Sequence, residues 1–245
     1  MARAALREGL DAFTVARLDG RELDLRLLVD HRERLVRHRV ELNSTRQWHL
    51  HDLWPELRLP DGALFSKRWT LRVGRRLPRA DQTMRVRIAR DALRRLRELT
   101  LAITQLESEI AELVQHLAPQ LLTEPGFGPL IAAKLVGEIA GAQRFATPAK
   151  LARAAGIAPI PASTGNTQRQ RPDQGGNRQI NAALHRVIVT RARCHQPTRD
   201  YIARRRAEGK STRDAIRCLK WYLARRVWRL LQPPTPSEKS LNLLT

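Results

Sequence analysis

The fold is decided by residues 89–117, which read ARDALRRLRELTLAITQLESEIAELVQHL. They belong to a helix predicted from about residue 81 to residue 117, in which apolar side chains recur with spacings that alternate between three and four. The apolar seam consists of Ala89, Ala92, Leu96, Leu99, Ile103, Leu106, Ile110, Leu113 and Leu117. A heptad pattern sustained over this length is typical of a coiled coil.

An earlier stretch, residues 22–51, also reads as a long helix and is one candidate partner. Leu28, Leu35 and Leu42 recur every seven residues, and Pro55 and Pro60 follow its end. The stripe is widened by Val29, Val36 and Val40, and the other faces carry Arg32, Arg34, Arg37 and Arg39. Either this helix folds back antiparallel on residues 89–117, or that seam pairs with the same helix of another subunit. The sequence leaves both arrangements open.

After Pro119 the pattern changes to shorter helical segments, up to about Leu231. We therefore predict a mainly α fold, in which a long coiled-coil helix pair is followed by a compact helical domain with a helix-hairpin-helix. The predicted divisions are residues 1–60 with the first helix, 61–118 with the second, 119–231 as the compact domain, and 232–245 as a disordered, proline-rich tail.

The charge of the chain points to a polyanionic partner. Its 245 residues contain 45 basic and 24 acidic side chains, which gives a formal net charge of +21. Only six of the basic residues are lysines, and the planar guanidinium group of arginine binds phosphate in a bidentate manner. This balance favours nucleic acid over a small-molecule substrate.

Cysteine usage and hydropathy narrow the class of protein further. Cys194 and Cys218 form no CxxC pair, which excludes a disulfide scaffold and a thiolate zinc site. No stretch approaches the ~18 consecutive apolar residues of a membrane-spanning helix. We therefore expect a cytoplasmic protein without a membrane partner.

Basic side chains are concentrated between residues 67 and 97. This stretch has twelve of them against two acidic residues, Asp81 and Asp91. A solvated helix face usually mixes both signs, so the imbalance favours contacts with phosphate groups.

Residues 121–139 predict a short helix, a Gly126-Phe127-Gly128 turn and a second helix that begins at Pro129. Phe127 is expected to anchor the hairpin in the core. Free N–H groups at the turn and at the helix N-terminus would then face outward as an anion site, as in a helix-hairpin-helix. The nucleic-acid contacts predicted in this segment are Gly126, Gly128 and Lys134. The alternative is an ordinary corner between two helices.

Two loops follow. Pro159 and Pro161 exclude a helix, and the hydroxyl residues Ser163 and Thr164 stand beside Gly165. Either hydroxyl could serve as a nucleophile if it is activated, although such residues in a glycine- and proline-rich loop are more often turn formers. Farther on, a Gly175-Gly176 turn opens a helix at about residue 177, and the arginines predicted to bind phosphate around it are Arg169, Arg171 and Arg178.

Residues 199–231 combine eleven basic side chains with four interleaved aromatic ones. The aromatic residues are Tyr201, Trp221, Tyr222 and Trp228. They could stack on bases, but their helical spacing favours a place in the core.

The order of these motifs resembles the C-terminal domain of the DEDD-type insertion-sequence transposases, which are serine-containing, bridge-RNA-guided DNA recombinases. The resemblance covers nearly the whole chain up to about residue 231. It rests on Pro125-Gly-Phe-Gly, Phe145-Ala-Thr, Ala155-Gly-Ile-Ala-Pro, Ser163-Thr-Gly, Gly175-Gly-Asn-Arg and His185, and upstream on Leu28-Val-Asp-His-Arg-Glu-Arg-Leu-Val and Trp48-His-Leu-His-Asp-Leu.

The resemblance implies a composite active site. In this family an N-terminal, RNase H-like domain supplies four acidic residues that hold Mg²⁺, and the C-terminal serine attacks a DNA phosphodiester and becomes joined to it. This chain departs from the pattern twice. The acidic domain is missing, so the chain is expected to be a truncated copy with no cofactor of its own. The position directly before the glycine is Thr164, and the serine, Ser163, stands one residue earlier.

These features lead to a functional prediction, an alternative, and a third hypothesis of a basic coiled-coil scaffold protein that oligomerises without affinity for nucleic acid. The prediction is the nucleic-acid-binding C-terminal portion of a transposase, with DNA as partner and with a structured guide RNA and a second subunit as further candidates. By itself this portion is expected to be inactive in strand cleavage. The alternative is a non-enzymatic, architectural DNA- or RNA-binding protein that uses the helix-hairpin-helix.

Overall fold

The computed structural model describes residues 19–60, 62–161, 170–173 and 175–233. Most of these residues are helical, so the predicted mainly α class is confirmed. Contacts divide the chain into two units, which are described separately. The helix-pair unit comprises residues 28–109, and the C-terminal unit joins residues 110–233 to the described residues before 28.

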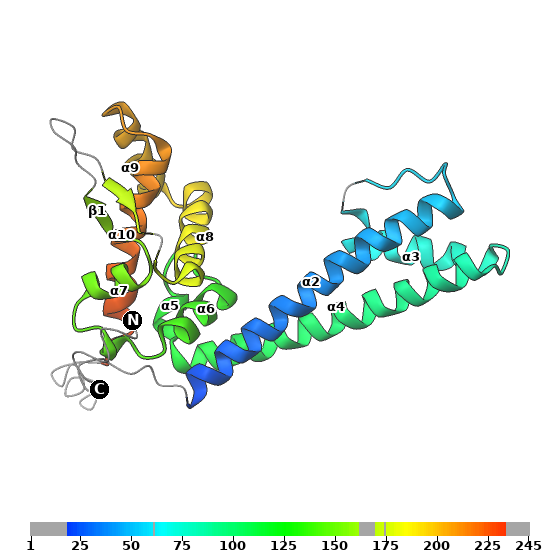
Figure 1. The fold of residues 1–245 in the computed structure, drawn as a ribbon, viewed down its shortest axis with the longest axis horizontal. Coiled ribbons are helices and arrows are strands. Elements are labelled where there is room, and N and C mark those ends of the chain that lie inside the picture. The colour runs from blue at the N-terminus through cyan, green and yellow to red at the C-terminus, as the bar shows by residue number, and fades with distance from the viewer. Residues whose placement is uncertain (1–18, 61, 162–169, 174, 234–245) are drawn as a thin grey trace. The chain divides into compact units, whose positions relative to one another are not determined.

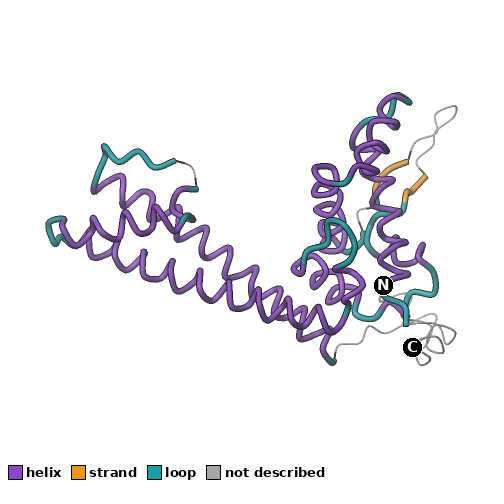
Figure 2. The backbone as a smooth tube through the Cα atoms, turned by 180° about the vertical axis from the view of Figure 1, so that it is seen from behind, coloured by secondary structure: helices purple, strands orange, loops and turns teal. Residues whose placement is uncertain are grey.

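Two long antiparallel helices form the helix-pair unit, and they lie side by side in Figures 1 and 2. Arg32 Nε donates to Glu107 Oε1 at 2.9 Å, whereas Leu50 packs in one cluster with Val86 and Leu93. The start of one helix therefore meets the end of the other, and the first helix folds back on the second. The elements are α2 (Arg21–Leu53), η2 (Ala63–Phe65), α3 (Lys67–Arg76), η3 (Leu77–Arg79) and α4 (Met84–Leu117).

The predicted apolar seam of α4 is its packed face. Ala89, Ala92, Leu96, Ile103 and Ile110 are buried, and the remaining seam positions are half-buried. The heptad spacing therefore identified the correct face of this helix. That the pair winds as a coiled coil stays a prediction.

The packed face of α2 differs from the predicted leucine stripe. Leu28, Leu35 and Leu42 are only half-buried. The positions that follow a four–three spacing through the interior are instead Leu25, Val29, Arg32, Val36, Arg39, Asn43, Arg46 and Leu50. The prediction that Arg32 and Arg39 lie on other faces is therefore wrong. Arginine can occupy such positions because its three-carbon stem packs as an apolar chain.

A compact apolar cluster closes the end of the pair near the α2–α3 connection. It contains Leu50 of α2, Val73 and Leu77 of the α3–η3 segment, and Val86, Ala89 and Leu93 of α4. Arg76 covers its edge, with its guanidinium carbon 4.4 Å from the ring centroid of Trp54. The side chains of the segment from η2 to η3 therefore pack over one end of the two long helices.

Shorter helices make up the C-terminal unit (Figure 1). Its elements are α5 (Pro119–Leu122), α6 (Pro129–Ile139), η4 (Ala142–Arg144), α7 (Pro148–Ala154), β1 (Pro159–Pro161), β2 (Gln170–Pro172), α8 (Arg178–Cys194), α9 (Gln196–Ala207) and α10 (Thr212–Leu230). All residues from 132 to 139 are buried, and α6 packs against α8. Helix α10 contacts α7, α8 and α9. These helices enclose a core that consists mostly of aliphatic side chains.

Gly137 allows the first turns of α2 to approach α6 closely. A Cβ atom at Gly137 would lie 3.0 Å from the Cα atom of Arg26 and 3.1 Å from its backbone nitrogen. Any side chain there would push the two helices apart. Glu138, the next residue, lies 3.8 Å from the guanidinium of Arg26.

The β-hairpin confirms that the two prolines exclude a helix. β1 and β2 pair antiparallel, with Pro159 opposite Pro172, Ile160 opposite Arg171 and Pro161 opposite Gln170. Ser163, Thr164 and Arg169 come between the two strands in sequence and lie outside the described residues. The predicted tail also lies outside them from residue 234 onward.

Candidate nucleic-acid interface

The predicted glycine turn joins α5 to α6, and only the first of its two glycines is required by the fold. Gly126 has φ +80°, and a Cβ atom there would lie 3.2 Å from the carbonyl oxygen of Val187 on α8. Gly128 has φ −85° as the N-cap residue of α6, is exposed, and has no atom within 4 Å of an added Cβ. Only Gly128 therefore lies where a bound phosphate could approach it freely.

Phe127 anchors the turn as predicted. Its side chain is 5% exposed. The guanidinium carbon of Arg191 lies 5.6 Å from the ring centroid, within the range of a cation–π contact. Pro129 is the first residue of α6, which also agrees with the prediction. α5 has only four residues, so the first arm of the hairpin is shorter than a typical helix.

A carboxylate holds the turn against α8 and α10. Glu124 Oε2 accepts from Arg191 Nη2 at 3.1 Å, and Glu124 Oε1 accepts from Arg226 Nε at 2.8 Å. Arg191 Nε also donates to the carbonyl oxygen of Pro125 at 2.6 Å. Burial lowers the pKa of Arg191, and the Glu124 carboxylate opposes that shift. Arg191 of α8 and Arg226 of α10 are thus engaged within the protein.

Lys134, predicted as a phosphate contact, is a buried residue of α6. Its relative exposure is 6%. A phosphate contact requires an exposed ammonium group, so we leave Lys134 out of the interface proposed below. Its position follows from the helix, because every residue from 132 to 139 faces a neighbouring element.

The start of α8 confirms the predicted helix boundary but shows a filled cap. Asn177 is the N-cap residue, and its Oδ1 accepts from the backbone N–H groups of Gln179 and Ile180 at 2.8 and 3.2 Å. Its Nδ2 donates to Glu138 Oε2 at 2.7 Å. The cap already satisfies the N–H groups that a bound anion would use. Arg178 is exposed beside it.

Glycines allow the loop after α7 and the turn before α8 to make close backbone contact. A Cβ atom at Gly176 would lie 2.0 Å from the backbone nitrogen of Gly156, which itself has φ +65°. Asn181 Nδ2 donates to the carbonyl oxygen of Gly156 at 3.1 Å. Lys220 Nζ donates to Asn181 Oδ1 at 2.8 Å, and burial lowers the pKa of Lys220. The base of the β-hairpin is therefore fixed to α8 and α10.

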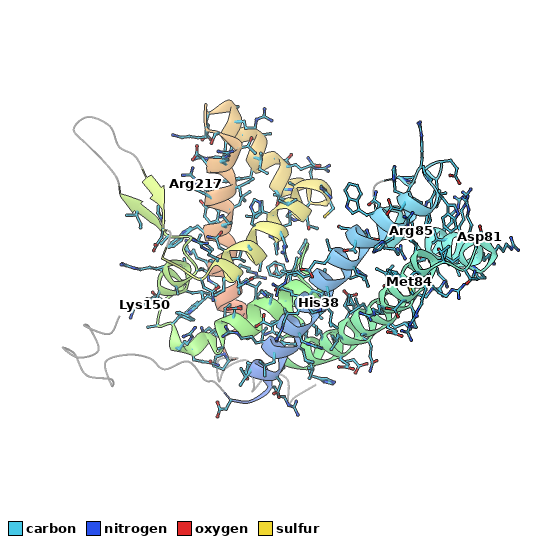
Figure 3. All side chains as sticks on the ribbon, turned by 45° about the vertical axis from the view of Figure 1, so that its right-hand side comes forward. His38, Asp81, Met84, Arg85, Lys150 and Arg217 are labelled. Atoms are coloured by element: carbon cyan, nitrogen blue, oxygen red, sulfur yellow. The ribbon has the colours of Figure 1, made fainter. Side chains whose placement is uncertain are left out.

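Exposed arginines gather on α8, α9 and α10. An open hollow of about 420 Å³ lies among these helices, with an apolar floor that includes Ile188, Ile202 and Ile216. Its rim carries Arg193, Arg199 and Arg206. We name these three residues the arginine rim. Arg217 of α10 and Lys150 of α7 also project from this unit (Figure 3).

Acidic side chains near the arginine rim have partners outside it, and Asp200 accepts from Gln196 Nε2 at 2.6 Å. Glu208 forms ion pairs with Arg204 and Arg205, and Asp214 forms one with Arg217. Among the described residues no ion pair involves the arginine rim. Its charges are therefore directed to solvent, which suits a polyanion.

The aromatic side chains of the last helices divide between core and surface. Trp228 Nε1 donates to the carbonyl oxygen of Phe145 at 2.8 Å and ties α10 to the loop before α7. Tyr201, Trp221 and Trp228 are half-buried, in agreement with the predicted core role. Tyr222 is 52% exposed, so the core prediction is wrong for this residue. Its ring meets that of Tyr201 edge to face at 6.1 Å.

The predicted charged stretch of the helix-pair unit is exposed. Between residues 67 and 97 all the basic side chains except Arg76 are exposed, and Arg94 and Arg95 both pair with Asp91. The exposure suits phosphate contacts, which stay a prediction.

The described residues do not offer the ligands for the Mg²⁺ that the family resemblance implies. Within the described ranges no three His, Cys, Asp or Glu side chains gather closely enough to hold a metal ion. We therefore derive no metal-dependent step from these residues. Nor is any helix in these ranges both long enough and apolar enough to cross a membrane.

Sequence reasoning missed the arginine rim and the role of Glu124. Arg199 and Arg206 are seven residues apart on one helix, a spacing that places them on the same face and could have revealed the rim. Glu124 gave no such signal, because its partners lie 67 and 102 residues later in the sequence.

Comparison with known proteins gives a family for the central part of this unit. Residues 118–203 match a family described as "Transposase IS116/IS110/IS902 family". The insertion element IS110 uncharacterized 43.6 kDa protein of Streptomyces coelicolor is 33% identical over 114 residues, which are 45% of this chain and 28% of that protein. The insertion element IS900 uncharacterized 42 kDa protein of Mycobacterium paratuberculosis is 30% identical over 115 residues, 46% of this chain and 29% of that protein.

The matched stretch thus covers less than a third of the length of either relative. The family match, residues 118–203, includes α5 to α8, the β-hairpin and the glycine contacts described above. Over residues 118–203 the chain is therefore similar to the transposase domain of the IS116/IS110/IS902 family.

Proposed function

We propose that the chain acts in DNA transposition, as the nucleic-acid-binding C-terminal portion of an insertion-sequence transposase. The observation that carries this proposal is the exposed arginine rim. Arg193 and Arg199 lie inside the stretch that matches the transposase family, and Arg206 lies three residues beyond its end. Exposed guanidinium groups without carboxylate partners bind phosphates independently of base sequence.

We also propose that the loop between β1 and β2 carries the nucleophile, Ser163 or Thr164. In this step the hydroxyl oxygen attacks a DNA phosphorus and forms an O–P ester bond. The bond from phosphorus to one sugar oxygen breaks, the hydroxyl proton passes to a base, and the leaving oxygen is protonated. The family resemblance and the transposase match across this loop support the step, which would require the acidic domain.

A mobility-shift titration over a range of salt concentrations tests the binding proposal. The double variant Arg199→Gln with Arg206→Gln should bind duplex DNA more weakly, and the slope of log affinity against log salt should fall by about 2. The matched control is Arg34→Gln with Arg37→Gln, which removes the same charge from exposed positions of α2. Equal loss in both variants would contradict a role specific to the rim, and salt-independent binding would contradict phosphate contacts altogether.

A covalent adduct tests the nucleophile. Assayed with DNA and Mg²⁺ in the presence of an acidic domain of this family, the chain should form a protein–DNA adduct that survives denaturation. Ser163→Ala or Thr164→Ala should abolish it, and the variant that does so identifies the nucleophile. Binding without any adduct would favour the alternative function, an architectural DNA- or RNA-binding protein. Competition with a structured RNA tests whether a guide RNA shares the same surface.

A further inference from the structure

Arg46 of α2 is a fully buried cation in the helix-pair unit. Its relative exposure is 0%, and Nε, Nη1 and Nη2 have no hydrogen-bond partner among the described residues. Burial, followed by the nearby charge of Arg97, lowers the pKa of Arg46 to about 10. The guanidinium is therefore still charged at neutral pH, and no carboxylate of the described residues pairs with Arg46.

Neighbouring groups increase the imbalance. Asn43 Oδ1 and Arg39 Nε are also buried without a partner. A small rotation could bring the amide oxygen of Asn43 to one N–H group of Arg46, but a guanidinium has five such groups, and the oxygen brings no counter-charge. A buried arginine without a counter-ion costs several kcal/mol. Apart from the Asn43 amide oxygen, the described residues here offer donors and positive charge without a counter-charge.

The η2–α3 segment packs against the polar side chains around Arg46. The guanidinium carbon of Arg39 lies 5.4 Å from the ring centroid of Phe65. Arg97 Nη2 donates to the carbonyl oxygen of Thr70 at 3.5 Å. A Cβ atom at Gly74 would lie 2.6 Å from that same Nη2. Arg97 is exposed and Arg46 is buried. One guanidinium group of the pair is therefore at the surface of the unit and the other is in its interior.

We propose that Arg46 and Arg97 form a binding site for a phosphate-type dianion beneath α3, either inorganic phosphate or the terminal phosphate of a nucleic-acid strand. The two neighbouring guanidinium charges match the charge of a phosphate monoester, which is close to −2 at neutral pH. Their planar forks supply the bidentate donors that phosphate oxygens accept. An internal phosphodiester carries one charge and a sugar on each side, so it fits a buried position less well. The site is separate from the arginine rim and does not depend on the proposed function.

Thermal unfolding in phosphate and in chloride at equal ionic strength tests the site. At a phosphate concentration about tenfold above the dissociation constant, the midpoint for the helix-pair unit should rise by roughly 6–11 °C. Arg46→Met keeps the side-chain length without the charge and should abolish this rise. Arg87→Met removes an exposed arginine of α4 and should keep it. An unchanged midpoint in wild type, or a full rise in Arg46→Met, would overturn the proposal.

Two further measurements separate the sources and protect against a variant that fails to fold. If the source is a strand end, wild type should bind a 5′-phosphorylated oligonucleotide about tenfold more tightly than its 5′-hydroxyl form. One well-placed charge-assisted hydrogen bond raises affinity by about this factor. Equal binding together with a phosphate-induced rise assigns the site to the free ion. Hydrogen exchange of residues 67–76 in wild type should slow with whichever ligand binds. Unchanged exchange with both ligands would overturn the proposal.

Discussion

Two arginines withdrawn from solvent, one in each unit, show opposite solutions to the same problem. Arg191 of the C-terminal unit has a side chain 14% exposed and reaches the Glu124 carboxylate at 3.1 Å and a backbone carbonyl at 2.6 Å. Arg46 of the helix-pair unit is 0% exposed, and its charged neighbour is another arginine. The first charge is compensated inside the fold, whereas the second is not.

The difference separates a structural arginine from one that is available to a ligand. A paired, partly buried guanidinium stabilises the fold only while its partner remains, because removing one partner leaves the other charge in a low dielectric. An unpaired buried guanidinium destabilises the fold until an anion arrives. The same residue type therefore predicts opposite responses to substitution in the two units.

The largest expected effect comes from removing the compensating charge in the C-terminal unit. Glu124→Ala leaves Arg191 buried without a counter-ion, and should lower the free energy of unfolding of this unit by about 3–5 kcal/mol. Urea denaturation, with hydrogen exchange to resolve the two units, measures the loss. Glu208→Ala removes an exposed carboxylate that also contacts two arginines, and should change stability by less than about 1 kcal/mol. Similar losses in both variants would remove the distinction.

The next effect is a change in stability that has opposite signs when the two arginines are substituted. Arg191→Met should destabilise the C-terminal unit by about 2–3 kcal/mol, because Glu124 and the Pro125 carbonyl lose a donor. Arg46→Met should stabilise the helix-pair unit by about 1–3 kcal/mol in phosphate-free buffer. The same denaturation experiment measures both, and a loss of stability in Arg46→Met would show that its charge is compensated after all.

The two glycines of the α5–α6 turn should differ by a smaller amount. Gly126→Ala forces a side chain into a positive-φ position against Val187 and Arg191, and should cost about 1–3 kcal/mol. Gly128→Ala has open space and an ordinary φ, so stability should change by less than about 0.5 kcal/mol. If the turn holds phosphate, Gly128→Ala should weaken DNA binding in the mobility-shift titration while the fold is unchanged.

The smallest effect concerns an exposed network, which shows what charge contributes without burial. Ser211 caps α10, and its hydroxyl, 2.5 Å from Asp214 Oδ2, is the main cause that lowers the pKa of that carboxyl below its ordinary 3.8. Ser211→Ala should cost about 1 kcal/mol at neutral pH. A depressed acidic pKa stabilises the fold above the ordinary value and loses that contribution as pH falls through the folded value. The difference between wild type and variant should therefore narrow below pH 3.8, which denaturation at a series of pH values measures.

Much of the local structure was predictable because its causes are local. The alternating spacing identified the packed face of α4, Pro129 marked the start of α6, and the residues around Asn177 marked the start of α8. Each signal depends on neighbours within a few positions, through helical periodicity or the geometry of a helix end. The α2 stripe failed because leucines every seven residues left two candidate seams, and the contacts of α4 selected the one that contains Arg39 and Arg46.

The candidate site was less predictable because its members meet from distant segments. Lys134 looked available in sequence but is covered on all sides of α6, and Glu124 finds its partners on α8 and α10. By itself, the sequence determined the helical class, the excess of guanidinium groups and the order of the transposase motifs, since composition and short-range spacing encode these. Only the tertiary structure decided which arginines pair with a carboxylate and which do not. Coulomb energies depend on distance and burial, and the folding of the chain sets both.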